Sequence, residues 1–161
     1  SHREVLSPEG LRMDGRRAKE VRRIQCELGT LSRADGSAVF QQGNTKVLAA
    51  VYGPRQPKHR NRALHDKAYV SCEYGISTFS MSERKVVSKA DRCELQRLRF
   101  RRSKETALLI RQTFEEIILT QLYPRSEISI FLQVLSDDGG WPFFCDRTGA
   151  RPAAINAATL A

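Results

Sequence analysis

The residues most suggestive of chemistry lie in the segment DDGGWPFFCDRTGARPAAINAATLA (137–161). Its double glycine favours a tight backbone turn, and the small-residue run AAINAATLA is typical of a closely packed helix. A glycine turn that leads into a helix can bind phosphate, because unpaired N–H groups and the positive end of the helix dipole point outward. The segment therefore predicts an anion site, with WPFFCDRTG inserted between the turn and the helix.

Other side chains in this segment have two interpretations each. Asp137 and Asp138 could form a paired-carboxylate site, but acidic residues before Gly-Gly more often serve turn formation. The aromatic residues of the insert could stack on nucleic-acid bases, pack against a partner protein, or belong to a misplaced insertion; they are Trp141, Phe143 and Phe144.

The charge of the chain indicates an anionic partner. Twenty-seven Lys and Arg face eighteen Asp and Glu, which gives a formal net charge of +9. One basic cluster comprises Arg84, Lys85, Lys89, Arg92, Arg97, Arg99, Arg101, Arg102 and Lys104. A second comprises Arg55, Lys58, Arg60, Arg62 and Lys67. Two clusters favour nucleic-acid binding over a merely solvated basic surface.

Composition and length favour one globular domain. The chain has 161 residues, 40% of them hydrophobic, which is ordinary for a protein with a real core. No apolar run reaches the roughly 18–20 residues of a membrane helix, and SHREVLSPEG has no apolar signal core, so we expect a soluble intracellular protein. The cysteines form no C-x-x-C pair and no His spacing completes a zinc site, so buried or incidental reduced thiols are expected.

The elements that would position these residues can be predicted from periodicity. Residues 21–31 and 37–42 form a predicted hairpin with Asp35-Gly36 at its turn, and 45–53 is a strand buried on both faces. Residues 68–75 are a fourth strand, and 76–101 lack a clear period and are interpreted as loop or mobile segment. An apolar stripe then predicts a helix from an N-cap at Ser103 to Pro124, followed by a strand with period two over 128–135 and a last helix. Strands followed by helices indicate an α+β domain with a mainly antiparallel or mixed sheet and helices on one face.

Five stretches together resemble the RNase PH family: RMDGRR (12–17), ADGSAVFQQGNTKVLAAVYGPR (34–55), STFSMSERK (77–85), IRQTFEEIILTQLYPRS (110–126) and INAATLA (155–161). The resemblance covers nearly the whole chain and implies a single RNase PH-type domain over 1–161 with the ribosomal-protein-S5-domain-2-like fold, as the N-terminal portion of the family domain. It also implies a hetero-hexameric ring of RNase PH-type exosome subunits, topped by cap proteins, that threads RNA 3′ end first in the nucleus, nucleolus and cytoplasm.

The same resemblance implies where RNA and phosphate would bind. In active relatives an Asp-Arg-Arg-Ser segment contacts RNA, a Gly-Thr-Arg-Ser segment holds phosphate, and an acidic pair lies farther downstream, usually with Mg²⁺. The corresponding RNA-binding candidates are Arg84, Lys85, Arg92, Arg101 and Arg102. The corresponding phosphate-binding candidates are Gly149, Ala150 and Arg151, in a degenerate motif.

Three departures from the family pattern affect the expected activity. The RNA motif is split into Asp91-Arg92 and Arg102-Ser103 by CELQRLRFR (93–101), and the phosphate motif is preceded by a second insertion near 141–149. Ala150 and Pro152 replace Thr and Ser, which removes two hydroxyl donors and one backbone N–H. The chain also stops before the expected acidic pair.

These departures favour a non-catalytic RNA-binding ring subunit of the exosome, with no catalytic residue, metal or cofactor. The alternative is an active phosphate-dependent 3′-to-5′ exoribonuclease that uses inorganic phosphate and Mg²⁺. A third interpretation is a free-standing RNA-binding domain. For the 161-residue chain alone we expect marginal stability or self-association, because apolar faces would lack their cover.

Overall fold

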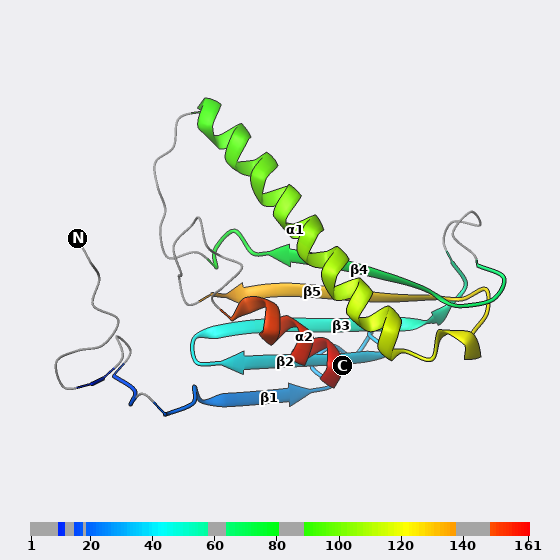
Figure 1. Ribbon diagram of the computed structural model, residues 1–161, viewed down its shortest axis with the longest axis horizontal. Helices are drawn as coiled ribbons and strands as arrows, with labels where there is room; N and C mark the ends of the chain where they lie inside the picture. The colour runs from blue at the N-terminus through cyan, green and yellow to red at the C-terminus, as the bar shows by residue number, and fades with distance from the viewer. Residues whose placement is uncertain (1–9, 12–14, 18, 58–63, 81–88, 138–148) are drawn as a thin grey trace.

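The described part of the protein forms one five-stranded sheet with two helices on a single face (Figure 1). The computed structural model describes residues 10–11, 15–17, 19–57, 64–80, 89–137 and 149–161. The strands are β1 (Ile24–Leu28), β2 (Gly36–Gln42), β3 (Thr45–Arg55), β4 (Tyr69–Ile76) and β5 (Glu127–Ser136). The helices are α1 (Lys89–Ile117) and α2 (Ala150–Leu160), with a short 3-10 turn at Thr120–Leu122. This arrangement confirms the predicted α+β class.

The sheet has the strand order β1-β2-β3-β5-β4. The first three strands form the predicted antiparallel meander, and β5 then pairs with β3 on one side and β4 on the other. The β4–β5 pair is parallel, because α1 carries the chain back between the two strands. The sheet is therefore mixed, and β5 lies inside it although it is the last strand along the chain.

The hydrophobic core lies between the sheet and its two helices. Alternate residues of β5 are buried, as its period of two predicts, and they pack with Ile110 and Phe114 of α1. On α2 the inward side is a stripe of buried alanines, whose small side chains allow the helix to lie close to β2 and β3. This close packing fixes the start of α2 relative to the sheet.

One prediction about β3 was wrong. Thr45, Val47 and Ala49 face the helices and are almost completely buried. On the other face Ala50 is also buried, but Lys46 and Leu48 are only partly covered. The described part of the chain places both helices on one face of the sheet. The second face of β3 is therefore buried at Ala50 but not at its neighbours, so the prediction of burial on both faces does not hold for the whole strand.

Asp35 joins the β1–β2 loop to β3. Its carboxylate accepts hydrogen bonds from the Gly53 N–H at 3.0 Å and from the Arg55 guanidinium at 2.8 Å. The Gly53 hydrogen bond is the largest cause that holds the pKa of Asp35 below its ordinary value. Desolvation opposes it, and the charge and hydrogen bond of Arg55 lower the pKa further. Asp35, which was predicted as part of the turn, thus holds the β1–β2 loop against β3.

Helix α1 begins much earlier than the sequence pattern predicts. It starts at Lys89, so the interpretation of 89–101 as loop or mobile segment was wrong, and Ser103 lies inside the helix instead of capping it. Residues 89–102 are rich in Lys, Arg, Leu, Glu and Gln, which favour helix, but they lack an apolar stripe. Residues 93–101, which divide the RNA motif of the family, are helical throughout.

The C-terminal limit of α1 was also predicted incorrectly. The helix ends at Ile117, well before Pro124, and the chain continues into the 3-10 turn. Ile117 and Leu122 continue the three- and four-residue apolar spacing that predicted this helix, yet they are 66% and 65% exposed. The described helices include none that is long and apolar enough to span a membrane.

Candidate nucleic-acid interface

The start of α2 has the geometry of a small anion site. Gly149 is the N-cap residue in a left-handed conformation (φ 102°), and none of the described side chains caps the helix. The first intrahelical bond runs from the Ala153 N–H to the Gly149 carbonyl at 3.0 Å. Pro152 occupies the first turn, as its ring geometry allows, but it contributes no N–H. The N–H groups of Ala150 and Arg151 are therefore the first-turn donors nearest the N-cap.

The side chain of Ala150 faces the core. It is 4% exposed and belongs to the same buried cluster as Ala153 and Ala154. Because residue 150 faces the core, replacing threonine by alanine there removes less hydrogen-bonding capacity from a solvent-facing site than the family motif suggests. The change that directly reduces the hydrogen-bonding capacity of the turn is Pro152.

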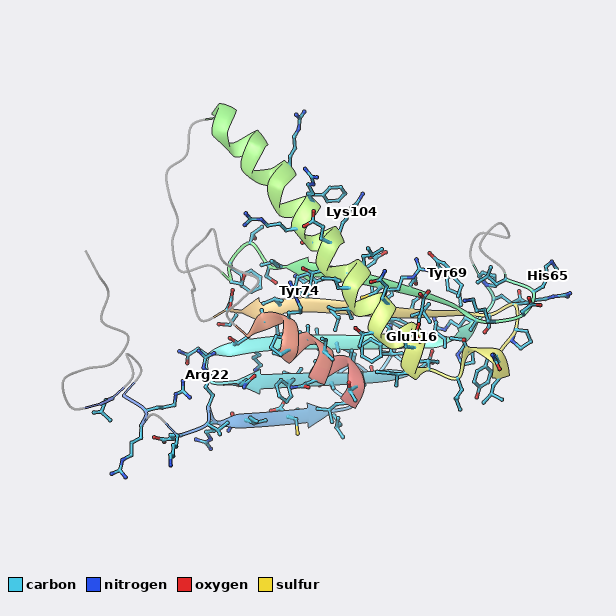
Figure 2. The ribbon with its side chains drawn as sticks, viewed as in Figure 1. Arg22, His65, Tyr69, Tyr74, Lys104 and Glu116 are labelled. Atoms are coloured by element: carbon cyan, nitrogen blue, oxygen red, sulfur yellow. The ribbon has the colours of Figure 1, made fainter. Side chains whose placement is uncertain are left out.

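Sequence reasoning missed Arg22, which lies beside this turn. A methyl group placed on Gly149 would be 3.5 Å from a guanidinium nitrogen of Arg22. Figure 2 shows Arg22 at the end of the sheet where α2 begins. Arg22 and Arg151 thus bring two guanidinium groups, each partly buried, to one helix N-terminus. The only signal in the sequence was the pair Arg22-Arg23 before β1, which is far from Gly149 along the chain.

The RNA-binding candidates lie on or before α1. Arg101 and Arg102 are exposed on the helix, and Arg101 forms an ion pair with Glu105 at 3.4 Å. Arg92 lies in α1, but its side chain is outside the described residues, as are Arg84 and Lys85 entirely. The structure thus places two of the five candidates on an exposed helical surface.

The described members of the two basic clusters do not form one surface. Arg55 and Tyr69 both pair with Glu127, so Arg55 and the described residues just before Tyr69 lie at one end of the sheet, opposite the end that carries Arg22 (Figure 2, where His65 is labelled). Arg55 is also engaged by Asp35, and its guanidinium lies 4.8 Å from the ring centre of Tyr52. Residues 58–63 are outside the described part. The cluster on α1 is therefore the better candidate for nucleic-acid binding.

An ionic and aromatic contact orients α1 on the sheet. Arg111 forms hydrogen bonds with Glu115 at 2.9 and 2.7 Å and with the Tyr69 hydroxyl at 3.2 Å. The same guanidinium lies 4.6 Å from the centre of the Tyr69 ring. Together with buried Ile110 and Phe114, this contact holds the C-terminal half of α1 on β4 and determines the direction of the N-terminal half.

The described residues do not provide a site for the Mg²⁺ that an active enzyme would use. Among them, His, Cys, Asp and Glu side chains form no group of three or more that could hold a metal ion. Cys26 is an exposed free thiol, which agrees with the incidental alternative of the prediction. Burial, with a smaller contribution from Glu73, raises the pKa of the Cys72 thiol to about 11, so it is inert at neutral pH.

The fold and the sequence define the class of protein. A family model described as the 3′ exoribonuclease family, domain 1, named RNase PH, matches residues 20–161. The chain belongs to the RNase PH family, and the resemblance found in its motifs is confirmed. A solved structure of rice Rrp46 is similar, with a TM-score of 0.63 and 30% identity, covering 91% of this chain and 56% of that one.

Relatives with higher identity are exosome components. The chain is 51% identical over 160 residues to an Arabidopsis thaliana exosome complex component RRP41 homolog, covering 98% of this chain and 58% of that protein. It is 50% identical over 159 residues to the human exosome complex component RRP41, with the same coverage. Identity to the Schizosaccharomyces pombe component ski6 is 44% over 161 residues, covering 100% and 59%. The chain thus spans somewhat less than three-fifths of the length of these relatives.

Proposed function

We propose that this chain is a non-catalytic, RNA-binding ring subunit of the exosome that supports 3′-to-5′ RNA processing and degradation. The proposed role as a ring subunit rests on the 50% identity to human RRP41 over 98% of the chain. Its partners would be other RNase PH-type subunits and cap proteins, in the nucleus, nucleolus and cytoplasm. The RNA-binding part is supported by the exposed basic surface of α1.

Exposed apolar side chains support a partner. On β1, Ile24 and Leu28 are 54% and 65% exposed, although they lie on the face of the sheet that carries the helices. On the helix layer, Leu108 is 53% and Ile117 is 66% exposed. Large apolar side chains grouped on an edge strand and an outer helix surface are typical of protein contacts.

The first prediction concerns assembly. Mixed with an RNase PH-type exosome subunit, the chain is expected to elute as a hetero-oligomer and to melt at a higher temperature than alone, because a partner that binds only the folded state stabilises it. Ile24→Ser with Leu28→Ser should weaken this complex. The matched control, Leu119→Ser with Leu122→Ser, removes exposed apolar residues elsewhere. A cooperative melt of a monomer that ignores such partners would support the free-standing domain instead.

The second prediction concerns RNA. Binding should tolerate sequence changes and weaken steeply with salt, because each Lys or Arg that neutralises a phosphate releases counterions. Arg101→Ala with Arg102→Ala should lower affinity similarly for unrelated single strands and reduce the slope of log K against log salt by about 0.7 per lost phosphate contact. Arg33→Ala with Lys67→Ala removes equal charge from exposed loop positions and should have less effect. An unchanged slope in the α1 variant would exclude these arginines from the contact.

The active exoribonuclease remains the second candidate, because one observation favours it. Arg22 lies beside Gly149 at the helix start that carries Arg151, and the first N–H groups of a helix point away from its body, which is a suitable place for a phosphate ion. The described residues contribute no metal-holding group to accompany it. The phosphorolysis experiment in the Discussion decides between the two candidates.

A further inference from the structure

The N-terminal half of α1 extends beyond the packed core. The buried residues described on this helix are Thr106, Ile110 and Phe114, all in its C-terminal half. Figure 1 shows the preceding turns passing over the edge strand β4 and continuing away from the sheet. Phe100 lies in this extension, and its ring is 64% exposed and so accessible to a ligand.

Phe100 is accompanied by basic residues on one face of the helix. We define the outer stripe as Arg97, Phe100, Arg101 and Lys104, whose spacings of three, four and seven residues place them side by side. At about 100° per residue, Arg97 and Lys104 lie about 180° and 160° from buried Thr106. The outer stripe therefore faces away from the sheet.

The contacts within the outer stripe leave its ring accessible. The Lys104 ammonium lies 4.2 Å from the centre of the Phe100 ring and covers one of its faces. Arg101 is paired with Glu105, but both side chains are largely exposed, at 79% and 62%, and such surface pairs contribute little free energy. Arg97 is exposed as well. An incoming phosphate can therefore replace Glu105 without a large cost.

We propose that the outer stripe binds single-stranded RNA, with one base stacked on Phe100 and neighbouring phosphates held by Arg97, Arg101 and Lys104. Arg97 and Arg101 lie about 6 Å apart along the helix axis, which suits successive phosphates of an extended strand. Aromatic rings between cations are the recurrent means of binding single strands without sequence preference. An acidic protein surface would bind the cations of the outer stripe but would not need the face of the Phe100 ring. The proposal rests on the proposed RNA-binding function and identifies its substrate as unpaired strand.

Substitutions of Phe100 measure the contribution of the ring to RNA binding separately from that of the charged residues. Phe100→Ala and Phe100→Leu should each weaken binding of a single-stranded RNA about 5- to 150-fold, because stacking one base contributes about 1–3 kcal/mol. The salt slope should stay unchanged, since no charge is lost. Phe100→Tyr keeps the ring and should retain affinity. Tyr123→Ala removes an aromatic residue, 48% exposed, beyond the other end of α1 and serves as the matched control. Circular dichroism of each variant establishes that the helix remains.

Two further ligands distinguish base stacking from phosphate binding. An abasic ribose-phosphate oligomer should bind the wild type and Phe100→Ala equally, and a duplex RNA should bind without dependence on residue 100. If Phe100→Leu matches the wild type on single-stranded RNA, or if Phe100→Ala loses the abasic oligomer equally, stacking is overturned while RNA binding by Arg101 and Arg102 still stands. If Arg101→Ala with Arg102→Ala also leaves RNA binding intact, the proposed function of this surface fails as well.

Discussion

Incubated with a 3′-labelled single-stranded RNA, Mg²⁺ and inorganic phosphate, this chain is expected to bind the RNA without releasing nucleoside diphosphate. Phosphorolysis must bring a phosphate ion against a phosphodiester, so it depends on donors that offset their repulsion. Pro152 removes one N–H from the helix start, and the described residues offer no group that could hold a metal. Loss of one such preorganised donor commonly costs about 10²–10³ in rate, and loss of the metal group costs more.

The control for this assay is Arg151→Ala. If the chain is non-catalytic, the variant and the wild type should give the same background with and without phosphate. Phosphate-dependent release of nucleoside diphosphate that disappears in Arg151→Ala would instead establish an intact site at the start of α2. Arg22→Ala, tested in the same assay, would then show whether the second guanidinium takes part.

The largest expected effect on stability comes from the contact between α1 and the sheet. Ile110→Ala should lower the free energy of unfolding by about 2–5 kcal/mol, because Ile110 is completely buried and its truncation leaves a cavity in the core. That is a large part of the roughly 5–15 kcal/mol typical of a folded domain. The measurement is urea denaturation followed by circular dichroism.

The matched control is the neighbouring residue on the same helix. Leu109 is 45% exposed, so Leu109→Ala removes a similar side chain from a less packed position and should cost much less. Comparable losses for the two variants would contradict the assigned packing of α1. Such a result would also remove the basis for the direction of its N-terminal extension.

Elements that pack on the core could be predicted from the sequence, whereas elements that do not pack on the core could not. The meander, β4 and β5 follow from alternating or continuous apolar residues, because burial itself produces those patterns. The first turns of α1 are stabilised by residue propensity without an apolar stripe, so periodicity gave no sign of them. Exposed Leu122 shows the reverse case, because the apolar spacing continues to it after the helix has ended at Ile117.

The candidate site was only partly predictable for a different reason. Gly149, Ala150 and Arg151 lie at a helix start, as the motif indicated, because a glycine and a proline there constrain the backbone locally. Arg22 could not be found, since its position depends on how β1 is paired and how α2 lies across the sheet. The separation of the two basic clusters is likewise a property of strand order, which charge counts do not reveal.

The position of β5 has a consequence for the order in which the chain acquires structure. During synthesis the β1-β2-β3 meander can close from contacts that are near in sequence, and α1 can form by itself. Until residues 127–136 emerge, however, β3 has an open edge and β4 has no neighbouring strand among those described. Such unpaired edges are the surfaces through which incomplete chains pair with one another. Arrival of β5 therefore joins two preformed parts, and this step completes the sheet.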